Sequence, residues 1–192
     1  LSALTNPDQA ASYAAAGVTA FAMELLPRIS RAQSMDVLSS QSNLAGYKAV
    51  LDAAHEFTRA FPMMMTAAGT IPPARVLVLG VGVAGLQAIA TARRLGAVVM
   101  GYDVRPAVKE QVESLGAKFV EVDSDATEGA ETTGGYAKEM GDDYKAKQAQ
   151  VLSDTLAKQD IAICTALIPG HPAPVLITEE MVKGMKPGSV IV

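Results

Sequence analysis

The sequence predicts an α/β fold: a doubly wound parallel sheet, preceded at the N-terminus by part of a second, flanking α/β domain. Three features lead to this prediction. Val76–Leu79 is an uninterrupted apolar run, typical of a strand buried on both faces. A glycine-rich turn and a helical pattern follow it over residues 80–95. Two more apolar segments, 97–102 and 117–121, alternate with helical ones, so the order β-α-β-α-β makes one mononucleotide-binding half of such a sheet.

The glycine-rich turn has the spacing G-x-G-x-x-G, formed by Gly80, Gly82 and Gly85. We expect Gly80 to make the tight turn, Gly82 to let the backbone approach a pyrophosphate, and Gly85 to allow close packing of helix on strand. The phosphates would lie at the helix N-terminus, where unpaired N–H groups and the helix dipole attract anions. Because a strand precedes the turn and a helix follows it, we favour a Rossmann-like dinucleotide site over a turn that only packs a helix on a sheet.

Asp103 ends the second predicted strand, at about the 20-residue distance from the glycines that this motif requires. A carboxylate at this position accepts hydrogen bonds from the adenosine ribose and repels a 2′-phosphate, which favours NAD over NADP. Arg105 could accommodate that phosphate instead, so its role stays open. The alternative for Asp103 is a solvated strand end.

The composition suits a globular protein of one domain, or one domain and part of another. Of 192 residues, 49% are apolar and 19% are charged, which supplies a core and gives no sign of disorder. The net charge of −4 argues against nucleic acid as a partner, because phosphate binding needs a basic face. We expect no membrane span, because the apolar stretch from 76 to 92 is broken by glycines.

The single cysteine, Cys164, excludes a disulfide framework and a thiolate metal site. It lies in an apolar run, which predicts a buried, inert thiol and fits a reducing, cytoplasmic setting. The chain begins at Leu1 rather than at methionine and stops on an apolar strand, so we expect a segment of a longer protein.

We expect residues 1–38 to be part of the flanking domain and residues 39–192 to be the nucleotide domain, entered by a long helix. A helix start is predicted at residues 5–8 and a short strand at 18–24. The polar stretch 28–40 could bind a carboxamide through its guanidinium, amide, carboxylate and hydroxyl groups. Composition alone favours a solvated connector, in which Asp36 or Ser39 caps the next helix.

The predicted helix over 41–59 carries His55, which we expect on the surface or in packing rather than in catalysis. Residues 61–65 are apolar and irregular, and their methionines are expected to fill the core. The prolines at 72 and 73 set the turn into the first strand.

Beyond Asp103, the pattern predicts a helix from Pro106, a strand at 117–121, a helix over 137–159, a strand at 160–165, a helix from Thr178 and a final strand. The long polar loop 123–136 is either a lid over bound nucleotide or an acidic surface insertion. We assign no role to His171, in the loop after the fourth strand.

Five segments resemble the NAD(H)-binding domain, domain I of the alpha subunit, of proton-translocating NAD(P) transhydrogenases, within the alanine-dehydrogenase-like superfamily. These are RISRAQSMD (28–36), AAGTIPP (67–73), VLGVGVAGL (78–86), TGGYAKEM (133–140) and TALIPG (165–170). The resemblance implies an NAD(P)+ transhydrogenase in which hydride passes directly between NAD(H) here and NADP(H) on a partner component. It also implies a membrane component that couples the transfer to proton movement, a homodimer, and a peripheral place on the cytoplasmic face of the inner membrane.

The resemblance also assigns site residues. Arg28, Asp36 and Ser39 would orient the nicotinamide carboxamide, and Gln33 would help to bring the two nicotinamides together. The remaining cofactor-binding positions it implies are Ile29, Ser30, Ser34, Met35, Gly80, Val81, Gly82, Val83, Gly85, Asp103, Val104, Arg105, Gly135, Tyr136, Gln148 and Leu167. No metal is implied, and direct hydride transfer needs positioning and exclusion of water rather than an acid–base residue.

Two alternatives stay open. An alanine dehydrogenase or related amino-acid dehydrogenase would share the nucleotide domain but use a lysine and a histidine on its substrate. A non-catalytic NAD-sensing module would bind the nucleotide without transferring hydride.

Overall fold

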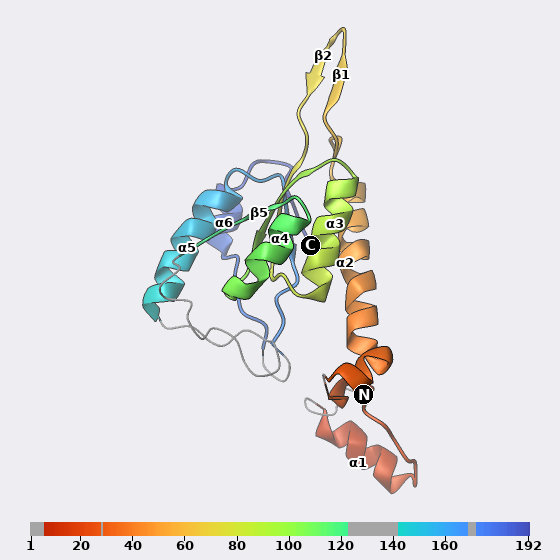
Figure 1. Cartoon of the computed structure of the whole chain (residues 1–192). Helices are drawn as coiled ribbons and strands as arrows, with labels where there is room; N and C mark the ends of the chain where they lie inside the picture. Colours follow the sequence, from red (N-terminus) through yellow and green to blue (C-terminus); the bar gives the residue numbers. More distant parts are fainter. Residues whose placement is uncertain (1–5, 28, 123–141, 169–171) are drawn as a thin grey trace.

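A five-stranded parallel sheet forms the centre of the computed structural model, which describes residues 6–27, 29–122, 142–168 and 172–192 (Figure 1). Its strands are β3 (Arg75–Leu79), β4 (Val98–Tyr102), β5 (Lys118–Phe119), β6 (Ile161–Cys164) and β7 (Val190–Ile191). They lie in the order β5-β4-β3-β6-β7, each parallel to its neighbour. The chain starts in the middle and winds first to one edge and then to the other, which confirms the predicted doubly wound sheet.

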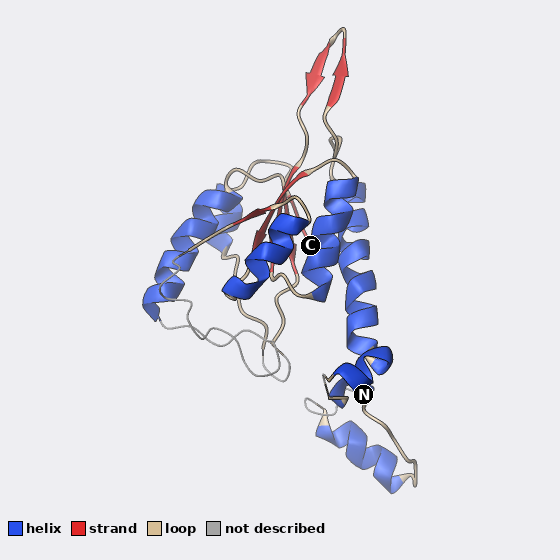
Figure 2. Ribbon diagram, in the orientation of Figure 1, coloured by secondary structure: helices blue, strands red, loops and turns tan. Residues whose placement is uncertain are grey.

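Helices cover both faces of the sheet (Figure 2). One face packs on α2 (Val37–Glu56), α3 (Val83–Arg94) and α4 (Lys109–Ser114). The other packs on α5 (Asp142–Leu156) and α6 (Glu179–Gly184).

Alternate side chains of β3 enter the two separate cores. Val76 and Val78 lie in the core beneath α2 and α3, whereas Leu77 and Leu79 lie beneath α5. All four side chains are 0% exposed. Since each contributes about 1.5–3 kcal/mol on burial, their uninterrupted apolar run is what a central strand requires.

Local signals set the ends of several helices as predicted. Pro106 occupies the first position of the 3₁₀ turn η3 (Pro106–Val108), which leads directly into α4. Gly116 follows that helix with φ of +77°, a conformation that favours glycine. Thr178 caps α6, and its hydroxyl accepts a hydrogen bond from the Met181 N–H at 3.3 Å.

The described N-terminal part contains α1 (Pro7–Ala15) and two 3₁₀ turns, η1 (Met23–Leu25) and η2 (Ser30–Met35). The strand predicted over 18–24 is wrong: residues 18–22 are irregular, and η1 follows. A strand needs a hydrogen-bonded neighbour, and no part of the chain that the structure describes pairs with this segment. Its apolar residues are exposed instead, Phe21 by 79%.

A β-hairpin replaces the predicted irregular, core-filling methionines. Strands β1 (Met64–Thr66) and β2 (Gly69–Ile71) pair in antiparallel fashion and project away from the body of the protein (Figure 1). Met63, Met64 and Met65 are 59%, 48% and 72% exposed. The prediction took apolar character as a sign of burial, but this segment leaves the core as soon as Phe61 has entered it.

The amino edge of the sheet is held together by one buried carboxylate, Asp160. It accepts hydrogen bonds from the Arg75 N–H at 2.9 Å and from Lys186 Nζ at 2.9 Å, and it pairs with Arg59. Burial by itself favours the neutral acid, but these hydrogen bonds outweigh it and hold the pKa of Asp160 below its usual value. The carboxylate therefore ties together the segments before β3, β6 and β7.

Two further predictions concern exposure. Cys164 is exposed, contrary to the prediction of a buried thiol, because it is the last residue of β6 and emerges at the carboxyl edge. Among the described residues, no helix has the length and apolar character to cross a membrane.

Candidate functional site

The turn between β3 and α3 uses its three glycines in three different ways. Gly80 has φ of +87°, and a Cβ there would lie 2.5 Å from the Ala166 nitrogen. A Cβ on Gly85 would lie 2.0 Å from the Gly80 carbonyl oxygen, so this glycine permits close packing of helix on turn. A Cβ on Gly82 would meet nothing within 4 Å. The open space lies at the N-cap of α3, which has no side-chain cap, and the first N–H groups of a helix lack acceptors within it. This space fits a phosphate group.

Asp103 and Arg105 form a compact pair beside this turn. The Asp103 carboxylate accepts hydrogen bonds from the Val81 N–H at 2.8 Å and from the Arg105 N–H and Nε at 2.9 Å each. Arg105 Nη2 donates to the same carboxylate at 2.8 Å and to the Val81 carbonyl at 3.3 Å. The two side chains are only 6% and 14% exposed, so the pair links the end of β4 to the glycine turn. Asp103 is thus not a solvated strand end.

The loop that precedes α2 presents a second group of polar side chains. Asp36 caps α2, where its carboxylate accepts hydrogen bonds from the Ser39 N–H at 3.0 Å and from the Ser39 hydroxyl at 2.6 Å. This confirms the predicted cap. Gln33, Ser34 and Met35 are exposed on η2, while the neighbouring Ala32 is buried and anchors the turn.

A hollow of about 560 Å³ joins this loop to the glycine turn. Its volume lies within the range of about 300–1,000 Å³ of small-molecule sites. The lining residues are Met23, Gln33, Ser34, Met35, Asp36, Val37, Ser39, Ser40, Asn43 and Val83. Six of the positions that the resemblance implied are therefore brought together: Gln33, Ser34, Met35, Asp36, Ser39 and Val83.

The other predicted positions are more scattered. Gln148, on α5, donates from Nε2 to the Tyr102 hydroxyl at 2.7 Å, immediately before Asp103 in the chain. Burial raises the pKa of Tyr102, whose hydroxyl also lies 3.1 Å from that of Tyr144. Leu167 is 67% exposed at the carboxyl edge. Exposed Ile29 and Ser30 and half-buried Val104 do not line the hollow.

Several predictions lie outside the described residues: Arg28, the Gly135–Tyr136 loop and His171. His55 is described and is exposed in the last turn of α2, away from the site, as expected.

Two lining residues, Ser40 and Asn43, were not predicted. A helical signal could have found Asn43, since it lies one turn after Ser39 on the same face of α2. Its side-chain amide donates to Gln87 Oε1 on α3 at 3.2 Å.

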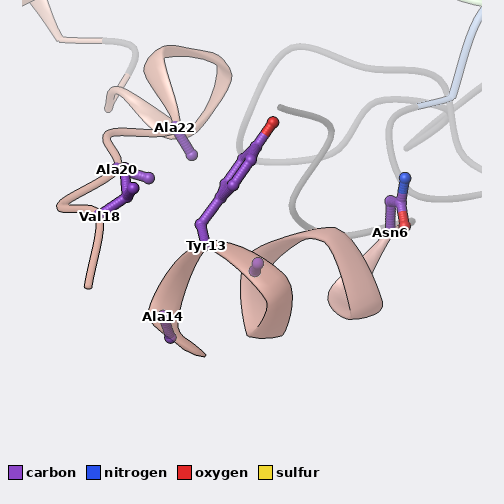
Figure 3. A pocket seen from close by; sticks show the side chains of 7 residues that line it. Asn6, Tyr13, Ala14, Val18, Ala20 and Ala22 are labelled. Atoms are coloured by element: carbon purple, nitrogen blue, oxygen red, sulfur yellow. The ribbon is translucent and has the colours of Figure 1, made fainter. Parts of the chain in front are cut away.

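A second hollow, of about 260 Å³, lies between α1 and the segment after it (Figure 3). Tyr13 rises from the helix beside Ala22, and the other lining residues are Asn6, Ala10, Ala14, Val18 and Ala20. None of them is charged, and the hollow has no chemistry that we can assign. Over the part of the chain that the structure describes, no group of three or more His, Cys, Asp or Glu side chains could hold a metal ion.

Two family models match this chain. The model described as "Alanine dehydrogenase/PNT, C-terminal domain" matches residues 49–192, and "Alanine dehydrogenase/PNT, N-terminal domain" matches residues 1–45.

Individual proteins agree with the family models. The first of the polypeptides that make up NAD(P) transhydrogenase subunit alpha in Rhodospirillum rubrum is 71% identical over 192 residues, covering 100% of this chain and 50% of that protein. Alanine dehydrogenase of Bacillus subtilis is 29% identical over 191 residues, covering 97% and 44%. The crystal structure of transhydrogenase from Sinorhizobium meliloti superposes with a TM-score of 0.87 at 59% identity, covering 100% of this chain and 50% of that one.

The chain spans about half the length of the curated relatives it matches. Most of its residues match one family model, and its sheet, glycine turn and polar loop have the arrangement that the resemblance implied. The chain belongs to the alanine dehydrogenase/PNT family and is similar to the alpha subunit of NAD(P) transhydrogenases.

Proposed function

We propose that this chain binds NAD(H) across the carboxyl edge of its sheet and passes hydride directly to or from NADP(H) on a separate component. A membrane component would couple this transfer to proton movement, with the chain lying peripherally on the cytoplasmic face. The chemistry that the nucleotide supplies is a reversible two-electron hydride transfer at its nicotinamide.

One observation carries the proposal: a single hollow joins Val83 of the glycine turn to Gln33, Asp36 and Ser39 of the polar loop. An extended dinucleotide needs a phosphate site and a polar site for its carboxamide at a fixed separation. The space beside Gly82 suits the first, because a Cβ there would meet nothing within 4 Å. The amide of Gln33 and the paired Asp36 and Ser39 suit the second, because a carboxamide needs both donors and acceptors.

The protein would act by orientation. Asp36 accepts the Ser39 hydroxyl proton, which leaves the Ser39 oxygen able to accept from the carboxamide N–H₂ group. Gln33 is exposed at the mouth of the hollow, where a second nicotinamide would approach. Hydride transfer needs the reacting atoms held about 3–3.5 Å apart, and residues that fix ring orientation serve that need.

Selectivity for NAD(H) would come from Asp103 with Arg105 in support. The carboxylate would accept a ribose hydroxyl and repel a 2′-phosphate. Arg105 already donates to this carboxylate through both Nε and Nη2, so it holds the acceptor in place rather than presenting a free cation.

An isotope experiment tests the proposed reaction. The complete polypeptide is mixed with its NADP(H)-binding component, NADP+ and NADH deuterated at the transferable position, and the NADPH is analysed by mass spectrometry. Direct transfer predicts that deuterium appears in NADPH even in ordinary water. NADPH without deuterium, or no NADPH at all, would refute the proposal.

Alanine dehydrogenase is the second candidate, because the Bacillus subtilis enzyme is similar at 29% identity over 97% of the chain. Oxidation of NADH by the complete polypeptide with pyruvate and ammonia, and without an NADP(H)-binding component, would favour it over the transhydrogenase.

We also propose that two copies pair through the β1–β2 hairpin. An isolated two-stranded hairpin is only marginally stable in water, and exposed strand edges are normally protected by charge. Residues 60–74 carry no charged side chain, so a second copy could lie against the hairpin without like-charge repulsion. Met65→Lys should shift sedimentation from dimer to monomer, whereas Val175→Lys, at a site 84% exposed elsewhere, should not. A Met65→Lys dimer would contradict this assignment.

A further inference from the structure

Helices α2 and α3 connect the two halves of the proposed site. The polar loop lies at the start of α2 and the glycine turn at the start of α3, and the helices lie side by side (Figure 1). The later part of α2 is fixed to the core through Val50 and Ala53, both 0% exposed. Its first residues extend beyond this anchor toward the hollow. The spacing between the two halves of the site therefore depends on where α2 meets α3.

The two backbones touch at Gly46. A Cβ added to this buried glycine would lie 2.0 Å from the Ala84 carbonyl oxygen and 2.8 Å from its carbonyl carbon. Those atoms belong to the first turn of α3, directly after Val83. Because carbon–oxygen contacts normally measure about 3.3 Å or more, a methyl group would force the helices apart by roughly 1.3 Å. Backbone atoms of a helix cannot move aside as a side chain could.

A hydrogen-bonded chain braces the same contact. Asn43 donates to Gln87 Oε1 at 3.2 Å, and Gln87 Nε2 donates to the Thr91 hydroxyl at 3.0 Å. Thr91 is buried and donates in turn to the Gln87 carbonyl at 2.8 Å. The Gln87 amide thus has a fixed orientation, with its oxygen toward α2.

We infer that Gly46, together with the Asn43–Gln87 hydrogen bond, is a positioning device that sets the distance from the glycine turn to the nicotinamide-orienting loop. This inference rests on the proposed function. Gly46 lies ten residues after Asp36, roughly 15 Å along the helix, so a displacement at Gly46 is carried to the loop. Misplacing reacting groups by about 1 Å can slow a reaction about 100-fold. The diphosphate and adenosine ends of the site are built from β3, α3 and β4 and would be little affected.

Gly46→Ala tests the inference in the complete polypeptide with its NADP(H)-binding component. Single-turnover hydride transfer should fall about 100-fold, while the Kd for NADH, measured by fluorescence titration, changes far less. Ala45→Ser, which adds one atom at the exposed neighbouring position, is the matched control and should behave as wild type. Wild-type transfer by Gly46→Ala, or equal losses in transfer and binding, would overturn the inference and leave the proposed function intact. Absence of transfer in the wild type would refute the proposed function, and this inference with it.

A second variant covers the case in which Gly46→Ala does not fold. Gln87→Ala removes the brace without touching the hollow and should slow transfer by about 2- to 10-fold, the equivalent of one hydrogen bond. Asn43→Ala should produce the same loss, and the double variant should lose no more than either alone. Full activity of Gln87→Ala would contradict the positioning role and leave Asn43 as a simple lining residue.

Discussion

Gly82→Ala separates a glycine needed for ligand approach from one needed for folding. Gly82 has φ of −85° and ψ of −159°, an extended conformation that alanine adopts without strain. The added methyl would meet no atom within 4 Å. We therefore expect its unfolding free energy to stay within about 1 kcal/mol of wild type, a change in Tm of no more than about 2–4 °C.

Nucleotide binding should respond very differently. A phosphate at the start of α3 would occupy the space into which the methyl projects, and its hydrogen bonds to backbone N–H groups would be lost or lengthened. Each hydrogen bond to a charged group contributes about 1.5–3 kcal/mol. Loss of one such bond should raise the Kd for NADH by about 10- to 150-fold.

Gly85→Ala is the matched comparison, because its methyl would lie 2.0 Å from the Gly80 carbonyl oxygen. Overpacking of this kind costs about 1–3 kcal/mol or more. Thermal unfolding and NADH fluorescence titration of both variants give the test. If Gly82→Ala binds NADH as tightly as wild type, no diphosphate lies over this turn and the reasoning fails.

Three further predictions concern other parts of the molecule. Asp103→Ala should weaken NADH binding and narrow the preference over NADPH, because Arg105 is then released to meet a 2′-phosphate; unchanged selectivity in parallel titrations would contradict this role. Gln33→Asn should slow hydride transfer far more than it weakens NADH binding, and equal losses would reduce Gln33 to a binding contact. Asp160→Asn should lower the unfolding free energy at neutral pH by about 1.5–3 kcal/mol, the contribution of a hydrogen bond to a charged group. Because the folded-state pKa of Asp160 is lowered, the wild-type advantage is complete above the unfolded pKa of about 3.9 and disappears as the pH falls through the folded value. Denaturant titrations at several pH values that show a constant difference would argue against the ion-paired carboxylate.

The sequence predicted the sheet well because its signals are local. The apolar run of β3 needs burial on both faces wherever it lies, and Gly80 needs its positive φ whatever surrounds it. Thr178 and Pro106 mark helix starts through contacts within one turn. Such signals need no knowledge of distant residues.

The errors arose where the structure depends on distant contacts. Exposure of Met65 and Cys164 is decided by where the chain leaves the core, which apolar character alone does not reveal. The predicted strand over 18–24 lacks a described neighbour, a condition that no pattern within those residues expresses.

Parts of the site show the same dependence. The closeness of Gly46 to Ala84 spans two helices far apart in the chain, so its helical pattern gives no sign of it. Asn43 is the intermediate case, because helical spacing places it beside Ser39 although only the structure brings Gln87 to it.

A crystal structure of the complete polypeptide with NADH tests the central claim most directly. We predict that its diphosphate lies over the turn at Gly82 and that its nicotinamide lies in the hollow beside Gln33, Asp36 and Ser39. A nicotinamide bound elsewhere, with that hollow filled by protein side chains, would contradict the account.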